Sequence, residues 1–248
     1  AACGFKTGGG SIQVGGALEV GGGCVVYAEC DRLTGAPMVF TSATVTVAAN
    51  GVIDATDRGF DVLWYGNDDR IPYPGMKAMP VYMGFWGTYS PGYGSAYNVG
   101  ASYGGIGGNS SSARLYGLPF APCLPGSTAG YYLNKPHRGG GAIRIITGQL
   151  RHDGTISAGG GFSESSNSGA SGGAVWISTD ITPVGRGTLS AIGGSNGNAS
   201  WKSGGGGGRI SVSIGLSDSE LDALMRGEIP AGMITNALAS VVPLAIDV

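Results

Sequence analysis

The sequence from residue 139 to residue 160 reads GGGAIRIITGQLRHDGTISAGG. Apolar residues two apart, such as Ile143 and Ile145, point to the same side of an extended chain. A second short strand lies around Leu150, and a Gly-Thr-Ile-Ser-Ala turn ends at Ala158. Glycine at both ends suits corners, where the chain turns or passes close to a neighbour. The stretch therefore predicts one coil of short β-strands joined at glycine corners.

The same unit returns at a spacing of about 33 residues. Gly187 follows Gly154 by 33 positions, and Ala174 follows Ala142 by 32. Coils with such a period stack on one another, so that a ladder of Ile, Val and Leu is buried while backbone hydrogen bonds run between coils. Further copies are found at residues 38–55 and from residue 206, and shorter related pieces occur between residues 8 and 27.

We predict an all-β fold, a parallel β-helix or β-solenoid that forms a single domain. Small residues such as Ala158 and Ala191 suit its tight inner corners. An ordinary β-sandwich with glycine-rich turns is the alternative, but the matched Gly-x-Ile-Ser-Ala ends favour the solenoid. Within residues 1–248 the parts are N-terminal coils (1–55), an aromatic-rich insertion (56–141), C-terminal coils (142–214) and a cap with a tail (215–248).

Composition excludes several classes of protein. Glycine and proline supply 50 and 12 of the 248 residues, but hydrophobic residues make up 42% and charged residues only 12%, the opposite of a disordered chain. The glycines follow no Gly-X-Y period, which excludes collagen. A net charge of −2 gives no support to a nucleic-acid partner. No stretch approaches the roughly 18 apolar residues of a membrane span. We therefore predict neither a nucleic-acid partner nor a membrane-spanning segment.

Four glycine-rich motifs stand in the second half of the chain. They are Gly139-Gly140-Gly141-Ala142-Ile143, Gly154-Thr155-Ile156-Ser157-Ala158, Gly172-Gly173-Ala174-Val175-Trp176-Ile177 and Gly207-Gly208-Arg209-Ile210. At these residues the chain resembles the glycine-rich repeat regions of large bacterial secreted and cell-surface proteins. The resemblance covers about residues 95–215 and implies a repeat scaffold of the adhesin-like kind. Gly160-Gly161 and Ile192 depart from its usual Ala-Asn-Gly-Gly turn, and it implies no catalytic residue.

Four cysteines are present: Cys3, Cys24, Cys30 and Cys123. No Cys-x-x-Cys pair occurs, so a zinc site is not predicted. An even number in a glycine-rich chain of low charge fits an oxidising compartment and two disulfides. Three pairings are then possible, and four buried free thiols are the alternative.

The aromatic residues gather in the insertion. Its 86 residues hold 15 of the 21 aromatic residues of the chain, and its length, far beyond that of a turn, predicts a structured segment. The rings either form a satellite core against the solenoid or remain exposed as a platform for sugars or a protein partner. The candidate platform residues are Trp64, Tyr65, Trp86, Tyr89 and Tyr93.

The sequence changes character after residue 214. Ser217 with Glu220 three residues later forms a capping box, and Leu221 and Leu224 then fall on one helical face. We predict a short helix that covers the open end of the solenoid, where backbone groups would otherwise be unpaired. The apolar tail from residue 233 onward must pack on the solenoid or on a neighbouring subunit.

Two polar clusters could carry chemistry. Lys135-Pro136-His137-Arg138 could form the cationic cluster of a polysaccharide lyase, which neutralises a uronate carboxylate and supplies a base; a solvated loop is the alternative. Asn67-Asp68-Asp69-Arg70 could hold calcium or the carboxylates of a glycosidase, and a turn is the alternative. The glycine runs are not phosphate loops, because no Gly-Lys-Ser/Thr follows them. We predict no catalytic residue, no metal and no cofactor.

The function predicted from these features is that of an extracellular or cell-surface scaffold, adhesin-like and self-assembling into a fibre. Its partners would be copies of itself or a cell-surface glycan. A carbohydrate-binding module that uses the aromatic insertion is one alternative. A polysaccharide lyase or hydrolase on a β-helix is another, and it rests on fold analogy alone.

Overall fold

The computed structural model describes residues 9–64, 77–81, 84–94, 99–109, 114–129, 137–162, 168–195, 203–229 and 245–247. Within these ranges the chain is mostly β-structure with one short helix. The elements are β1 (Ser11–Val20), β2 (Val25–Tyr27), β3 (Met38–Val47), β4 (Val52–Asp54), β5 (Val62–Trp64), β6 (Lys77–Val81), β7 (Gly84–Thr88), β8 (Ala142–His152), β9 (Thr155–Ser157), β10 (Ala174–Thr179), β11 (Thr188–Ser190), β12 (Arg209–Ile214), α1 (Asp218–Met225) and β13 (Ala245–Asp247).

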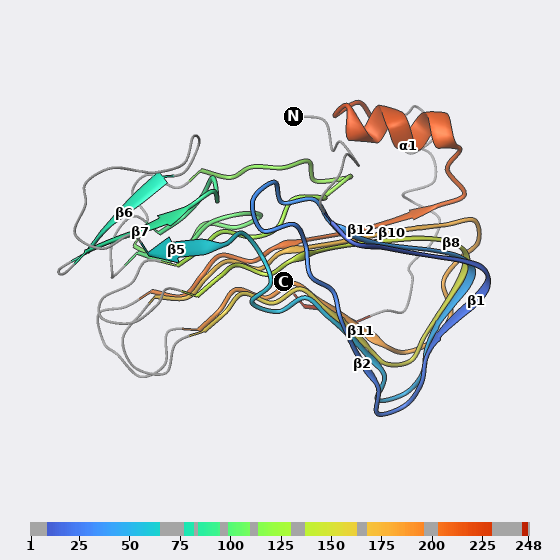
Figure 1. Cartoon of the computed structure of the whole chain (residues 1–248). Coiled ribbons are helices and arrows are strands. Elements are labelled where there is room, and N and C mark those ends of the chain that lie inside the picture. The colour runs from blue at the N-terminus through green and yellow to red at the C-terminus, as the bar shows by residue number, and fades with distance from the viewer. Residues whose placement is uncertain are drawn as a thin grey trace.

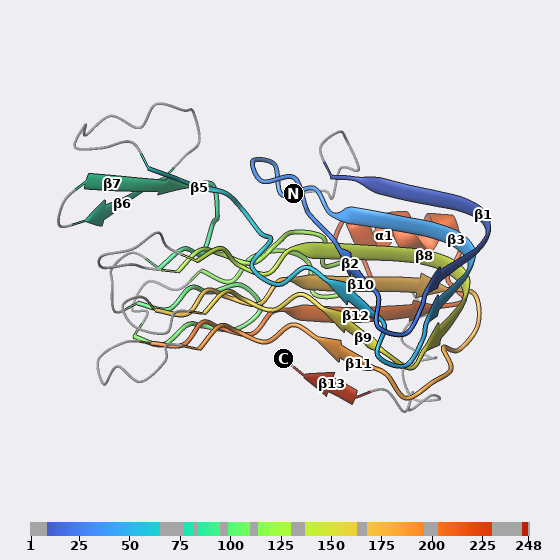
Figure 2. The ribbon, with the colours of Figure 1, turned by 60° about the horizontal axis from the view of Figure 1, so that its bottom comes forward.

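Two five-stranded, all-parallel sheets form the body of the molecule (Figure 1). Sheet A has the order β1-β3-β8-β10-β12, and sheet B has the order β13-β11-β9-β4-β2. Both orders follow the chain, because each successive coil adds one strand to each sheet. The strands are stacked one above another (Figure 2). This confirms the predicted parallel sheets, and the stacking is consistent with a solenoid-like fold.

The core between the two sheets consists of aliphatic side chains in register. In sheet A, Phe40 pairs with Ile145, which pairs with Ile177. In sheet B, Ile53 pairs with Ile156. All five side chains are buried in one hydrophobic cluster. Each contributes about 1.5–3 kcal/mol relative to an exposed position, so the ladders hold successive coils together.

An alanine follows directly after each of the first four strands of sheet B. These residues are Ala28, Ala55, Ala158 and Ala191, and all are fully buried. The N–H group of one corner alanine donates to the next coil, as from Ala55 to the carbonyl of Ser157 at 2.7 Å. The predicted small residues Ala158 and Ala191 therefore lie at tight inner corners.

A ladder of hydroxyl residues crosses the middle of sheet A. Ser42 is in register with Thr147, and Thr147 with Thr179. The hydroxyl of Thr147 donates to the carbonyl of Gln149 at 2.9 Å, two residues further along the chain. Ser42 and Thr179 make the equivalent bonds. The hydroxyls of Ser42 and Thr179 also donate to the neighbouring coil, at the carbonyls of Gly16 and Gly148. Residues 38–47 form one continuous strand, β3, and not two short ones.

Beyond the alanine corners, the glycine-rich segments form a bundle of their own. Its extended segments belong to no strand and bond to one another through backbone groups. In the segment from residue 168 to residue 173, Gly169 and Gly172 both donate to the segment 203–208, whereas Ala170 and Gly173 both donate to the segment 158–161. Ser171 donates in a third direction, to Ser127. We call this array the glycine bundle; its segments are 99–108, 126–129, 137–141, 158–162, 168–173, 191–195 and 203–208.

The hydrogen-bond directions in the segment 168–173 repeat every three residues, and this repeat identifies the geometry of the glycine bundle. A polyproline-II-type helix has three residues per turn and no internal hydrogen bonds, so every third N–H group faces the same neighbour. Glycine is required because the segments touch through their backbones. A Cβ atom on Gly205 or Gly208 would overlap a carbonyl oxygen, that of Ala170 or Gly173 respectively. The glycines predicted as corners of coils are therefore mainly packing residues.

The predicted insertion is not separate from the coils. Its strands β5, β7 and β6 form a small antiparallel sheet, while residues 99–108 and 126–129 run within the glycine bundle. Tyr103 is fully buried, with its ring centroid 4.6 Å from that of Tyr116, and it packs with Ala142 and Ala174 of sheet A. These two rings belong to a satellite core, one of the two predicted alternatives.

Helix α1 has the predicted capping box, in which Ser217 and Glu220 bond to each other's backbone. Its position differs from the prediction, however. Leu224 packs against Trp176 on the outer face of sheet A, so the helix covers a face and not the end of the stack. The physical reason is Trp176, a large apolar side chain that points outward from sheet A and is buried from water by the helix.

β13 pairs in parallel with β11, so the described part of the apolar tail joins its own sheet; residues 230–244 lie outside the described residues. In the part of the chain that the structure describes, no helix is long and apolar enough to cross a membrane.

Candidate anion-binding site

A group of charged residues lies where the first two coils leave sheet B. Glu29 follows the corner alanine of the first coil, and Asp57 and Arg58 follow that of the second. The third coil has Gly160 at this level, where a Cβ atom would overlap the carbonyl oxygen of Ala170. The first two coils thus carry side chains where the third coil has glycine, at one end of the glycine bundle.

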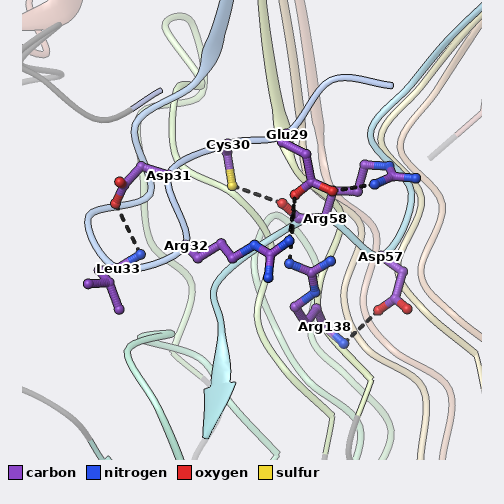
Figure 3. Close-up of polar contacts among 8 residues, drawn as sticks. All are labelled: Glu29, Cys30, Asp31, Arg32, Leu33, Asp57, Arg58 and Arg138. Atoms are coloured by element: carbon purple, nitrogen blue, oxygen red, sulfur yellow. Dashed lines mark hydrogen bonds and ion pairs between the residues drawn. The ribbon is translucent and has the colours of Figure 1, made fainter. Parts of the chain in front are cut away.

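Three guanidinium groups surround the carboxylate of Glu29 (Figure 3). Arg58 donates from Nη1 to Oε1 of Glu29. Nη2 of Arg32 lies 3.7 Å from Oε2, and Nη1 of Arg138 lies 3.8 Å from the same atom. Both distances exceed the ~2.7–3.2 Å of an N–H···O hydrogen bond. One carboxylate thus faces three cations but forms a hydrogen bond with only one of them.

The backbone holds this arginine cluster in place. Asp57 accepts a hydrogen bond from the backbone N–H of Arg138 at 2.7 Å, and its Oδ2 lies 3.7 Å from Nδ1 of His137. The carbonyl of Arg32 accepts from the N–H of Asp61 at 2.8 Å. Arg32 and Arg138 therefore start from fixed backbone positions, which lowers the entropic cost of presenting their side chains.

The turn that carries Arg32 is stabilised by Asp31. The Asp31 carboxylate accepts hydrogen bonds from the N–H groups of Leu33 and Thr34 and from the Thr34 hydroxyl. Burial raises the pKa of Asp31, but these hydrogen bonds outweigh it and hold the pKa below its ordinary value. The Asp31 carboxylate thus forms its hydrogen bonds within its own turn.

Tyr27 forms the apolar side of the cluster. The guanidinium carbon of Arg58 lies 4.2 Å from the centroid of the Tyr27 ring, a cation–π distance. The ring nevertheless stays 59% exposed. An aromatic surface and several cations are therefore presented side by side.

Several donors of the cluster have no acceptor. Nε of Arg58 and Nη1 of Arg138 are buried and bond to no described residue, and Oε2 of Glu29 also lacks a partner. Buried charged donors without acceptors are costly. Guanidinium groups match planar oxyanions with two parallel N–H donors, so the arrangement is suited to binding an anion.

No family model matches the chain, and neither a curated protein nor a solved structure does so.

The predicted aromatic platform falls in and near the small antiparallel sheet. Trp64 of β5 and Trp86 of β7 are direct cross-strand partners. Tyr89 and Tyr93 are half-buried, and Tyr65 lies outside the described residues. The structure brings the two tryptophans together in register, and their use as a binding platform stays a prediction.

Of the two polar clusters considered from sequence, one lies in the site. His137 and Arg138 are part of the arginine cluster, and a role for His137 as the base of a lyase stays a prediction. The segment 67–70 lies outside the described residues. Among the residues with described positions, no group of three or more His, Cys, Asp or Glu side chains could hold a metal ion.

The prediction of two disulfides is wrong, because two of the four cysteines are free thiols. Cys24 is exposed on a turn, and Cys30 is buried, with Sγ donating to the carbonyl of Arg58 at 2.9 Å. Cys123 is buried beside Trp176, and Cys3 lies outside the described residues. Cys30 thus supports the backbone that carries the arginine cluster.

Alkaline pH is expected to destabilise the fold through Cys30. Burial raises the pKa of this thiol from 9.0 to about 12. Above pH 9 the unfolded chain releases the proton while the folded chain keeps it, so stability falls until the folded pKa is reached. The loss reaches about 4 kcal/mol for three pH units. Below pH 9, where the thiol is protonated in both states, this loss of stability is absent.

Thermal unfolding near pH 8 and near pH 10.5 checks this expectation. The wild type should lose about 2 kcal/mol more than Cys30→Ala over this interval. Buried Tyr103 and Tyr116, whose pKa values are also raised by burial, act equally in both proteins. Cys24→Ala removes an exposed thiol and should behave as the wild type. Equal losses in the wild type and Cys30→Ala would contradict the assignment.

Sequence motifs predict only part of this site. The motif at residues 135–138 includes His137 and Arg138, whereas no motif marks Tyr27, Glu29 or Arg58. An alignment of the coils on their corner alanines would have pointed to Glu29 and Arg58, because both stand where the third coil has glycine. A charged residue where another coil has glycine is the signal.

Proposed function

We propose that the chain is an adhesin-like extracellular surface scaffold, a β-solenoid that associates end to end into a fibre. The supporting observation is the end of the stack at β1 and β2. Among the described strands these are the last of sheets A and B, and each pairs with one neighbour. β1 has ten residues with one charge, Glu19, and no proline. A bulge interrupts its pairing with β3 between Val14 and Ala17, but the part before the bulge, residues 11–14, has neither a charge nor a proline to prevent pairing with another chain.

The outward side of β1 can be assigned from its hydrogen bonds. The carbonyl of Gly10 accepts from the N–H of Val39 in β3 at 2.9 Å. Because N–H and C=O directions alternate along a strand, Gln13 directs its backbone groups away from β3. Val25 and Tyr27 of β2 are 47% and 59% exposed at the same end. A second copy could extend both sheets here, and contacts of this heterologous kind give filaments.

Sedimentation velocity over a wide concentration range tests the proposal. The wild type should form species larger than a monomer as the concentration rises. Gln13→Pro removes an outward N–H group and should keep the chain monomeric, whereas Gln13→Thr should associate as the wild type does. A monomer at all concentrations, or association unchanged by Gln13→Pro, would count against this mode of assembly.

Glycan binding is the second candidate function. It is supported by the exposed ring of Tyr27 beside the arginine cluster and by the cross-strand pair of Trp64 and Trp86. Aromatic rings offer flat apolar surfaces on which the C–H faces of sugars stack. The fold would then display this binding surface at one end of the scaffold.

A glycan array with neutral and acidic members tests this second function. Binding of at least one glycan class is expected, and Tyr27→Ala, Trp64→Ala or Trp86→Ala should weaken it if the ring concerned takes part. Phe162, which is 51% exposed, provides the control variant Phe162→Ala. An array with no bound glycan would remove this function and leave the scaffold proposal intact.

A further inference from the structure

We propose that the arginine cluster is a subsite for the carboxylate of an acidic sugar, such as a uronic acid unit in a polysaccharide. The inference rests on the proposed glycan binding and names its substrate class. The carboxylate would lie between the guanidinium groups of Arg32 and Arg138, and the sugar ring would lie against the exposed part of Tyr27.

The donors for such a carboxylate are already positioned. Arg32 and Arg138 approach Oε2 of Glu29 to 3.7 and 3.8 Å without forming hydrogen bonds, and Nη1 of Arg138 is buried without an acceptor. A ligand carboxylate placed between them would supply the missing acceptors. Charge-assisted bonds of this kind are about twice as strong as neutral ones.

Glu29 shows which chemical group the cluster accommodates. It is itself a carboxylate, and it sits among three guanidinium groups through a single hydrogen bond, that from Arg58. Its side chain is 39% exposed, so it lies close enough to the surface to compete with an arriving anion. Glu29 thus acts as an internal occupant that a stronger or better placed carboxylate would outcompete.

Arg138 is the central donor because both its backbone and its side chain are held in place. The Arg138 side chain is only 15% exposed, and its backbone N–H donates to Asp57. Arg32, with a side chain 52% exposed, lies at the rim and can move toward a ligand. A nucleic acid is disfavoured as the ligand, because the chain carries a net charge of −2 and the three arginines gather around a single carboxylate.

Isothermal titration with tetragalacturonate and with the neutral sugar tetragalactose, each on the full chain, tests the proposal. Tetragalacturonate should bind at least tenfold more tightly than the neutral probe at low salt, and the preference should shrink as salt is added. Arg32→Gln should weaken tetragalacturonate binding by about tenfold and leave thermal stability unchanged, because Arg32 makes only a long ion pair at the rim.

Glu29→Gln gives the sharper result, because the proposal predicts a change of opposite sign. Removing the competing carboxylate should tighten tetragalacturonate binding several-fold. If the arginines only support the fold, both Arg32→Gln and Glu29→Gln would leave affinity unchanged or weaken it. Arg226→Gln, at the C-cap of α1, matches the loss of one exposed positive charge and should leave binding as in the wild type.

The outcomes separate this inference from the proposed function on which it rests. Equal binding of the acidic and neutral probes, or a clear preference for a sulfated oligosaccharide over tetragalacturonate, would overturn the carboxylate subsite while glycan binding stands. Failure of every glycan to bind would overturn both.

Discussion

Gly172→Ala should lower the free energy of unfolding by about 3 kcal/mol or more, at the upper end of what overpacking costs. Gly172 lies in the innermost segment of the glycine bundle, in which every described residue from 168 to 173 is buried. A Cβ atom there would overlap the carbonyl oxygen of Ala191 and would lie 2.6 Å from the nitrogen of Gly208.

The cost at Gly172 comes from space and not from backbone conformation. Its φ angle is outside the left-handed region, so alanine could adopt the same backbone without strain. What it meets is backbone, which cannot move aside like a flexible side chain. To admit one methyl group the segment must separate from its neighbours, and the hydrogen bond from Gly172 to Gly206 is lost or stretched.

Gly16→Ala is the matched control. A Cβ atom on Gly16 meets nothing within 4 Å, and Gly16 lies in the edge strand β1. Its stability should remain within about 0.5 kcal/mol of the wild type. Urea unfolding followed by circular dichroism measures both variants. Equal stabilities for Gly172→Ala and Gly16→Ala would show that the glycine bundle is not closely packed in solution.

Trp176→Ala is expected to cost about 3–5 kcal/mol, the range for removing a buried large aromatic side chain. Trp176 is fully buried between sheet A and α1, against Leu224 and Ala121. Its Nε1–H donates to the hydroxyl of Ser213 at 3.4 Å. Its removal should therefore leave a cavity under the helix.

A second contribution comes from Arg144. This arginine is 2% exposed, and its guanidinium carbon lies 3.6 Å from the centroid of the Trp176 ring. It donates to the hydroxyl of Ser178 at 2.7 Å, and no salt bridge joins it to a described carboxylate. Burial lowers its pKa to about 9, so it is still charged at neutral pH. Without Trp176 this buried cation loses its main electrostatic partner.

A double-mutant cycle separates the two contributions. Arg144→Met, Trp176→Ala and the double variant should give a coupling energy of about 2 kcal/mol, the magnitude for a desolvated cation–π pair. Phe162→Ala removes an aromatic residue that is 51% exposed and should cost less than about 1 kcal/mol. Additive losses in the cycle would show that Arg144 draws no stability from the ring.

The parts of the fold that follow from local patterns could be predicted. The alternation of Ile143 and Ile145 and the corner at Ala158 are local, and they led to parallel strands with small residues at the corners. The capping box at Ser217 is local as well, and the helix begins there. In each case a few neighbouring residues are enough to determine the conformation.

The glycine bundle could not be predicted in this way. A run of glycines has no side-chain pattern, and its three-residue repeat becomes visible only when the neighbours of Gly169 and Gly172 are known. The arginine cluster depends equally on distant parts of the chain, since Glu29, Arg58 and Arg138 come from three separate segments. The position of α1 depends on Trp176, whose contact with Leu224 joins two segments far apart in the sequence.

The three-residue repeat of the glycine bundle also limits how this chain can change in length. Inserting one residue into the segment 168–173 would rotate every following N–H group by about 120° around the segment axis, so each donor would face the wrong neighbour. An insertion of three residues would restore the directions. We therefore expect homologous chains to differ inside these segments by multiples of three residues, and by any number between them. Length variation would then reveal the bundle in an alignment, where composition cannot.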